Sequence, residues 1–437
     1  MDALSRSIGI LLKVEKSYIP KAEYVFRTYC KIIGLQPIFF YDDTREDVHV
    51  YYGSKSDEKY PIEIYYDENA AKFFEDSVPL DNKLAHFVRY RNDNVPFIFS
   101  KHGRIFQYSL NCLEICKDIV ASAFFFLTCW QEYATGKLKS CEPLDFSCKF
   151  QKEWNIDDFP IVDRYCDIFH KALETALPGY QKENRWPFEK TFAVSVSHFR
   201  HNALSMTSSS NNHRDYNKKL KQLEKHYELS PTNFLPLPLE ESTPIPNTNS
   251  NGKFNQAIGL ITTQSFDLNI LRNTIKQYSD NLTPVHGFCY MEHNFHYHDL
   301  MEQLDGVGIK YDMSISYFSL PGYRAGISYP FYPFNIKENL PFSVLEIPLV
   351  LNSRISTATM NLGVPKELTK KYTRNLMNYL VRYSLQNRSH FSFCWNEATG
   401  KELDESAFHY GKTIEELGKK NAWLCSLDEI YEYWSNR

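Results

Sequence analysis

The chain has 437 residues, of which 43% are hydrophobic and 23% charged, and its formal net charge is −4. This length exceeds what one ordinary hydrophobic core organises, so we expect two domains. Interspersed charges with a small negative sum exclude a strongly basic surface, and with it nucleic acid or an anionic membrane as an electrostatically attracted partner.

The first residues and the longest apolar run bear on the compartment of the protein. Lys13, Glu15 and Lys21, among others, interrupt every apolar stretch in residues 1–34, so no signal-peptide core can be drawn there. The most apolar segment, 119–130, is shorter than the roughly 20 residues that a membrane-spanning helix needs. Ten cysteines without a CxxC pair favour reduced thiols. We therefore expect a cytoplasmic protein without a transmembrane segment.

The first half of the chain mixes strand-like and helical patterns. Strands are expected at 61–66 and 95–100, and a long helix at about 113–133. A second helix is expected at 160–177, where apolar residues recur on one face behind a first-turn proline. These elements predict an N-terminal mixed α/β domain over residues 1–188.

From Thr191 onward the pattern changes to short apolar runs separated by polar, helix-forming stretches. Such alternation is typical of a parallel sheet or barrel built from strand and helix units. The expected strands are 192–197, 257–262, 285–290, 343–351 and 390–395, and the expected helices are 365–386, 413–417 and 426–434. Capping-box spacings mark two helix starts, at Thr413 and at Ser426.

The second domain is expected to cover residues 189–437 and to carry a polar, irregular insertion at 202–253. Within that insertion a helix is expected near 218–227 and a short strand near 234–237. The fold class is therefore α/β in both domains.

Several ordered blocks carry a resemblance to a known family. These blocks are DIVASAFFFLTCWQEYATG at 118–136, PIVDRY at 160–165, YDMSISY at 311–317, PGYRAGISYP at 321–330 and LEIPL at 345–349. With them the chain resembles the polysaccharide deacetylase (NodB-like) superfamily, in the bacterial branch that has an additional N-terminal domain. The resemblance runs from roughly residue 64 to residue 434. It implies that the second domain is a distorted (β/α) barrel.

The resemblance also implies which chemistry to look for. Family members remove acetyl groups from N-acetylated sugars with a divalent metal, an aspartate base and a histidine acid. In the matching stretch 196–201 (VSHFRH), His198 matches the motif histidine, but Phe199 stands in place of the base and His201 in place of a metal ligand. A phenyl ring neither takes up a proton nor binds a cation.

Other catalytic positions depart from the family pattern as well. Asn396 follows Trp395 where the acid histidine is expected, and an amide cannot deliver a proton. Ile261 and Ser353 replace a metal-binding histidine and an expected aspartate. We therefore expect a non-catalytic homologue with no metal cofactor, which binds a glycan or acts as a scaffold in bacterial surface-polysaccharide biosynthesis.

Three residues are expected to contact the ligand, an N-acetylated glycan or a polysaccharide precursor. They are Arg324, Asp312 and Trp395. Arg324 is suited to orient a carboxylate, a phosphate or a substrate acetyl group, although a guanidinium in this loop equally serves to tie down a neighbouring loop.

A second hypothesis keeps the chain an enzyme. Imidazole side chains suit zinc and other divalent transition metals. A relocated metal site would draw its ligands from His198, His201, His293, His296 and His298. Glu292 or Asp299 would then act as the base of an N-deacetylase or amide hydrolase. The plainer interpretation is that these histidines belong to a polar loop. A third hypothesis is a protein-interaction module without a cleft at the barrel mouth.

Overall fold

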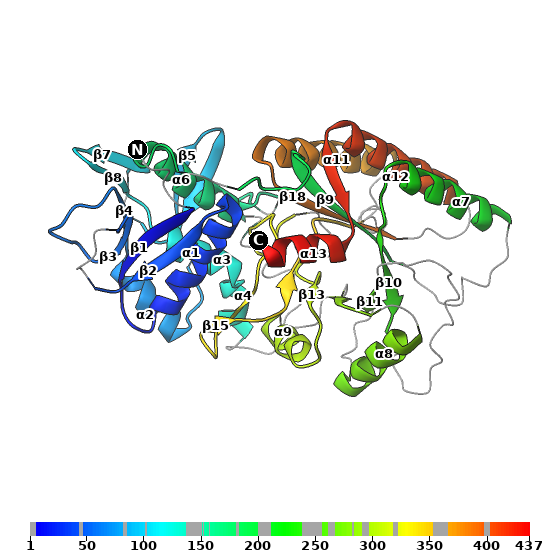
Figure 1. Cartoon of the computed structure of the whole chain (residues 1–437), viewed down its shortest axis with the longest axis horizontal. Helices are drawn as coiled ribbons and strands as arrows, with labels where there is room; N and C mark the ends of the chain where they lie inside the picture. The colour runs from blue at the N-terminus through cyan, green and yellow to red at the C-terminus, as the bar shows by residue number, and fades with distance from the viewer. Residues whose placement is uncertain are drawn as a thin grey trace.

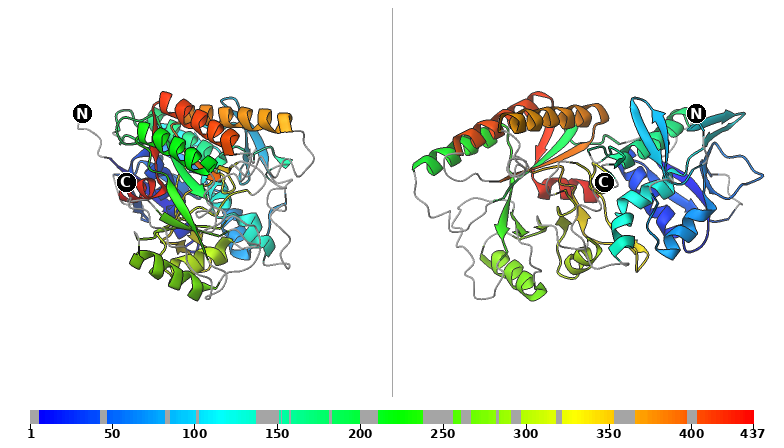
Figure 2. Two further views of the ribbon diagram at one scale, coloured as in Figure 1. Left: turned by 90° about the vertical axis from the view of Figure 1, so that its right-hand side faces the viewer. Right: turned by 180° about the vertical axis from the view of Figure 1, so that it is seen from behind.

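The structure is a computed structural model of the whole chain. It describes residues 6–42, 47–81, 85–100, 103–136, 151, 153–156, 158–180, 183–199, 211–237, 256–260, 267–281, 284–290, 297–317, 322–352, 366–396 and 403–437. Two β-sheets organise the described part of the chain, one in each half of the sequence, and they lie side by side along the longest axis of the molecule (Figures 1 and 2).

The first sheet has the strand order β2-β1-β3-β4-β8-β7. Its strands are β1 (Ser7–Lys13), β2 (Gln36–Phe40), β3 (Val50–Gly53), β4 (Ile62–Tyr65), β7 (Phe106–Ser109) and β8 (Cys112–Ile115). All neighbours are parallel except β7 and β8, which form a hairpin. A separate hairpin pairs β5 (His86–Tyr90) with β6 (Asp93–Phe97).

Helices α1 (Ile19–Ile33), α3 (Ile119–Leu127) and α6 (Ile161–Ala176) pack against one face of this sheet and share its core, while α2 (Glu68–Asp76) adds Phe74 to the same core. The side chain of Asp118 caps α3 by accepting a hydrogen bond from Ala121 N at 2.8 Å. Strand β4 and helix α6 confirm the elements expected at 61–66 and 160–177.

The long helix expected at 113–133 is wrong in two respects. Its beginning is strand β8, because residues 112–115 pair with β4 and β7. Its end is broken at Cys129, whose φ of 46° is left-handed, so a separate short helix α4 (Trp130–Gly136) follows. The break turns α4 away from α3 and toward the second half of the molecule (Figure 1).

The second sheet is parallel throughout and has the order β16-β13-β12-β11-β10-β9-β18-β17, with β19 beside β9. Its strands are β9 (Phe192–Phe199), β10 (Thr232–Pro236), β11 (Gln256–Leu260), β12 (Gly287–Tyr290), β13 (Tyr311–Asp312), β16 (Leu345–Glu346), β17 (Leu351–Asn352), β18 (His390–Asn396) and β19 (Ala422–Cys425). The two outer strands of this order, β16 and β17, belong to one short segment of chain, 345–352. The sheet is therefore curled.

The helices of the second half are α7 (Asn211–His226), α8 (Leu268–Asn281), α9 (Tyr297–Asp305), α11 (Lys366–Asn387), α12 (Leu403–Lys419) and α13 (Leu427–Asn436). A small hairpin, β14 (Phe334–Asn335) with β15 (Leu340–Pro341), leans on α1. The mixed α/β architecture confirms the fold class expected from the sequence, and the second half contains a parallel sheet that is curled. The helix and strand expected inside the insertion correspond to α7 and β10.

Two further expectations are corrected. Residues 343–351 do not form one strand, because only β16 and β17 at the ends of this stretch pair with neighbours. Thr413 lies inside α12 rather than at its start, since Tyr410, Ile414 and Leu417 pack as one helical face on the sheet. The capping box at Ser426 is confirmed as the start of α13.

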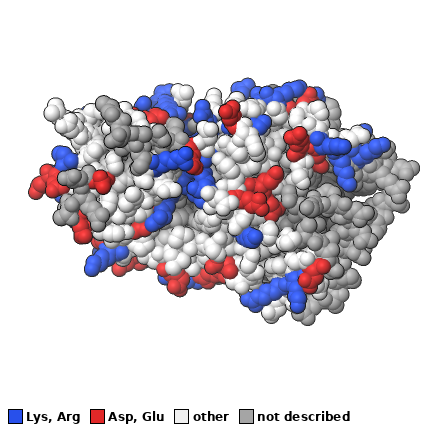
Figure 3. All heavy atoms as spheres, in the orientation of Figure 1, with Lys and Arg blue, Asp and Glu red and all other residues white. Residues whose placement is uncertain are grey.

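Both halves contribute to the largest hydrophobic core, where Phe124 of α3 lies edge-on to Phe334 at 5.1 Å. The boundary proposed at residue 188 lies between α6 and β9. Lys and Arg side chains intermingle with Asp and Glu on the face shown in Figure 3. Within the described ranges, none of the helices combines the length and the hydropathy needed to cross a bilayer.

Candidate functional site

A pair of buried carboxyl groups lies at the carboxyl ends of β13 and β16. Asp312 and Glu346 occupy the same register position of these neighbouring strands, and both side chains are fully buried. Burial raises the pKa of Asp312 to about 6. Burial and the neighbouring Asp312 carboxyl raise the pKa of Glu346 well above its ordinary value. The buried pair therefore favours a state in which the two carboxyl groups hold a proton over one in which both are charged.

This carboxyl pair orients the segment that follows β13. Asp312 accepts hydrogen bonds from Ser314 N at 3.0 Å and Ser314 Oγ at 2.7 Å, while Glu346 Oε1 accepts one from Ile315 N at 2.9 Å. The structure thus places Asp312, a predicted ligand contact, among the groups that hold its own loop. Glu346 was not singled out from the sequence, although it is the one charged residue in the apolar run 344–351.

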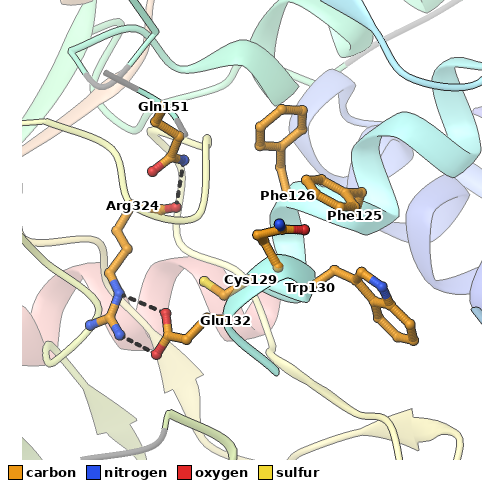
Figure 4. Close-up of a pocket in the computed structure, with 8 residues that line it drawn as sticks. Phe125, Phe126, Cys129, Trp130, Glu132, Gln151 and Arg324 are labelled. Atoms are coloured by element: carbon orange, nitrogen blue, oxygen red, sulfur yellow. Dashed lines mark hydrogen bonds and ion pairs between the residues drawn. The ribbon is translucent and has the colours of Figure 1, made fainter. Parts of the chain in front are cut away.

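Arg324 follows in the next loop and forms a buried ion pair with Glu132 of α4. The guanidinium Nη2 lies 2.5 Å from Glu132 Oε1, and Nε lies 3.3 Å from Oε2 (Figure 4). The side chain of Arg324 is only 1% exposed and that of Glu132 is 16% exposed. A two-pronged contact of this kind fixes both groups in orientation as well as in position. It joins the two halves of the chain.

A small pocket lies beside this ion pair, between α3, α4 and the loop of Arg324 (Figure 4). Its lining combines aromatic rings with polar groups: Phe125, Phe126, Cys129, Trp130, Gln131, Glu132, Gln151 and Arg324. Gln151 Nε2 donates to the backbone carbonyl of Arg324 at 3.1 Å, and Tyr317 donates its hydroxyl to Gln151 Oε1. The pocket therefore has walls from both halves of the chain.

The end of β9 carries two of the predicted positions on opposite faces of the sheet. Phe199 points to the inside of the curled sheet, where its ring stacks on Phe234 with centroids 5.5 Å apart. A side chain at Gly259 of β11 would meet this ring, since a Cβ there would lie 2.2 Å from Phe199 Cε2. Phenyl rings thus fill the inner end of β9.

His198 faces the helices on the outside of the sheet. Its Nε2 lies 3.0 Å from Glu224 Oε1 of α7 and 3.2 Å from the hydroxyl of Tyr410 of α12. Trp395 is the register partner of His198 and packs its ring on Tyr410 at 5.4 Å. The structure therefore places Trp395 and His198 together on the helix-covered face, and Phe199 on the other. Asn396 ends β18 in register with Phe199.

The histidine set proposed as an alternative metal site is only partly described. His298 lies in the first turn of α9, with its ring 4.7 Å from that of Tyr133 of α4 and 4.8 Å from that of Tyr297. It thus packs on α4, whereas His198 packs on α7 and α12. His201, His293 and His296 lie outside the described residues, as does Glu292. In the described ranges, no group of three or more His, Cys, Asp or Glu side chains is arranged to hold a metal ion.

Comparison with known proteins adds one family match. The model of a family of unknown function, DUF7033, matches residues 10–178. No curated protein matches the chain.

Among solved structures, the chain is similar to a candidate polysaccharide deacetylase from Mycobacterium smegmatis, with 14% identity and a TM-score of 0.39 over 57% of this chain and 92% of that one. It is also similar to an uncharacterised protein from Clostridium thermocellum that binds two copies of 5-methyl-5,6,7,8-tetrahydrofolic acid, with 9% identity and a TM-score of 0.29 over 52% of this chain and 95% of that one. Likeness at this level assigns no activity to the chain.

Proposed function

We propose that this protein binds an N-acetylated glycan at the carboxyl end of its curled sheet and does not hydrolyse it by the deacetylase route. The sheet is then a distorted barrel of polysaccharide-deacetylase type, and the protein acts in bacterial surface-polysaccharide biosynthesis. The resemblance of the sequence blocks supports the barrel type, the ligand class and the setting. The side chains at the inner end of β9 support the loss of hydrolysis.

Phe199 carries this proposal. Deacetylation by the family route needs a base within hydrogen-bonding reach of a metal-bound water. At the position that the resemblance gives to this base, Phe199 is 2% exposed and is wedged between Phe234 and the backbone of Gly259. A water and a cation would have to displace a packed aromatic ring, and the ring offers neither a lone pair nor a proton acceptor in return.

Arg324 and Asp312 remain the polar groups of the family pattern at this end of the sheet. Both are used by internal contacts, Arg324 with Glu132 and Asp312 with Ser314. We therefore propose that they set the shape of the binding surface, and that their loops present backbone and side-chain groups to the ligand. Recognition of a neutral glycan does not require a charged group to be released from its partner.

The test combines catalysis, metal content and binding on the purified full-length protein. We expect no acetate release from fully N-acetylated chito-oligosaccharides with or without added zinc, no stoichiometric metal by elemental analysis, and saturable binding of the oligosaccharide by titration calorimetry. Acetate release that depends on zinc and disappears in the His201→Ala variant would establish the relocated histidine site instead. Absence of any saturable binding would favour a protein-interaction module.

A further inference from the structure

We propose that α4, from the first half of the chain, forms one wall of the glycan-binding site, with Tyr133 as the ring on which a neutral sugar packs. This inference rests on the proposed function and assigns part of the recognition to the N-terminal unit. Helix α4 extends from the first half of the chain toward the second half (Figure 1), and the ion pair of Glu132 with Arg324 places it at the carboxyl end of the second sheet.

The ion pair between Glu132 and Arg324 fixes α4 in this position. Arg324 belongs to the segment that follows β13, so its contact with Glu132 places α4 beside the carboxyl end of that strand. Because the guanidinium is almost fully buried, separating the pair would leave a charge in a poorly hydrated environment. The helix is therefore a fixed part of this end of the sheet.

The next residue of α4 contacts a second loop at the same end. Tyr133 packs on His298, and His298 lies in the first turn of α9, which follows β12. Adjacent residues of one short helix thus contact the chain that follows two neighbouring strands, β12 and β13. Ligands of parallel α/β sheets bind at this end of the strands, where the connecting loops gather.

The chemistry of this wall suits a neutral sugar. Tyr133 is partly exposed and also lies 5.4 Å from the ring of Trp130, so it presents an aromatic surface held by other rings. A flat ring packs on the apolar face of a sugar, and the polar side chains beside it bind hydroxyl groups. Since Arg324 balances the charge of Glu132, the wall has no excess positive charge that would select an acidic sugar.

The experiment measures binding of a fully N-acetylated chito-oligosaccharide to the full-length protein by titration calorimetry. We expect Tyr133→Leu to weaken binding about tenfold, which corresponds to about 1.4 kcal/mol. Tyr133→Phe, which keeps the ring, should bind within about twofold of the wild type. Tyr108→Leu is the matched control, because Tyr108 is 65% exposed on β7, and its binding should equal that of the wild type.

The outcomes separate this inference from the proposed function. If the wild type binds and Tyr133→Leu binds equally well, the role of α4 is wrong while glycan binding stands. If the wild type does not bind, both fail. If Tyr133→Leu does not fold, hydrogen exchange on the wild type tests the inference instead. Added oligosaccharide is expected to slow exchange in residues 130–136 but not in the β7–β8 hairpin. Unchanged exchange in 130–136 would overturn the inference.

Discussion

Asp312 and Glu346 face each other across neighbouring strands, and neither carboxyl group is exposed to water. Their ordinary pKa values are 3.8 and 4.5, and both are raised in the folded protein, that of Asp312 to about 6. The folded state therefore keeps protons that the unfolded chain releases. This contribution to stability is complete below about pH 4 and is lost as the pH rises through 6 and beyond.

We predict that Glu346→Gln flattens this pH dependence. The amide still accepts the hydrogen bond from Ile315 N and donates to Asp312, but it has no proton to release. Between pH 6 and pH 9 the variant should lose less free energy of unfolding than the wild type, as measured by urea denaturation at a series of pH values. Asp118 and Asp163, whose pKa values burial raises to about 7, add the same trend to both proteins and cancel in the difference.

Glu338→Gln serves as the control for this series, since Glu338 is exposed and the variant should run parallel to the wild type. If the free energy of unfolding of Glu346→Gln changes with pH as it does in the wild type, the two carboxyl groups do not share a proton, and our description of this carboxyl pair is wrong.

Single residues also show what the sequence reveals of the candidate site. Asp312 and Arg324 were identified from the family blocks, because their neighbours in sequence carry the resemblance. Glu132 also lies in such a block, 118–136, but it was not singled out, because its role depends on Arg324, which lies 192 residues away in the chain. A partner so distant in sequence becomes visible only when the two halves are placed side by side.

At the scale of elements, local sequence signals correctly predicted helices whose formation depends mainly on local interactions. Helix α6 follows from its apolar periodicity, and α13 follows from its capping box, in which Ser426 Oγ accepts from Glu429 N at 3.1 Å and Glu429 Oε2 accepts from Ser426 N at 2.7 Å. The same spacing at Thr413 predicted a helix start that the structure does not have. Helix α12 begins earlier and continues past Thr413, because its apolar face packs on the sheet. Tertiary contacts decide where local signals are weak.

We predict that Ser426→Ala destabilises the protein by about 1 kcal/mol, since it removes the cap of α13 and leaves Glu429 N without its acceptor. Ser426→Thr keeps the hydroxyl and should cost only a few tenths of that. Urea denaturation of both variants checks the difference. Equal stability of the alanine and threonine variants would mean that burial of α13, rather than its cap, holds this helix in place.

At the scale of the whole molecule, the pattern of apolar runs predicted a parallel sheet, and only the family resemblance implied that this sheet would curl. Apolar strand runs such as β9 and β18 are recognisable, because they are long and buried on both faces. Strands β16 and β17 have two residues each, and their pairing with β13 and β18 depends on contacts far away in the sequence. The contacts between the two halves of the chain could not be predicted from the sequence for the same reason.

The segment that follows Arg324 contributes several contacts between the two halves of the chain. Gly326 accepts a hydrogen bond from Val162 N at 2.7 Å, and Ser328 N donates to Asp163 Oδ1 at 3.1 Å, so the loop lies along the first turn of α6. Further along, the hydroxyl of Tyr329 accepts from Arg185 at 2.7 Å. These contacts tie the loop of one half to a helix of the other, and we expect the two halves to unfold in one transition.

Gly326 tests this expectation. Its φ of 65° favours glycine, and a Cβ there would lie 2.8 Å from Ile161 Cγ2 of α6. Gly326→Ala should therefore cost backbone strain and also push the loop off α6, about 2–3 kcal/mol in all. Gly308→Ala isolates the first cost, since its φ is 81° and nothing lies within 4 Å of a Cβ there; about 1 kcal/mol is expected. The extra free energy of unfolding that Gly326→Ala loses, compared with Gly308→Ala, measures the contribution of the contact between this loop and α6.

Hydrogen exchange shows whether both sheets are destabilised by the loss of this contact. Amides of β1 and of β9 should lose protection together in Gly326→Ala, because the loop joins their cores. Loss confined to β9 would mean that the halves are stable independently, and α4 would then be free to leave the second sheet.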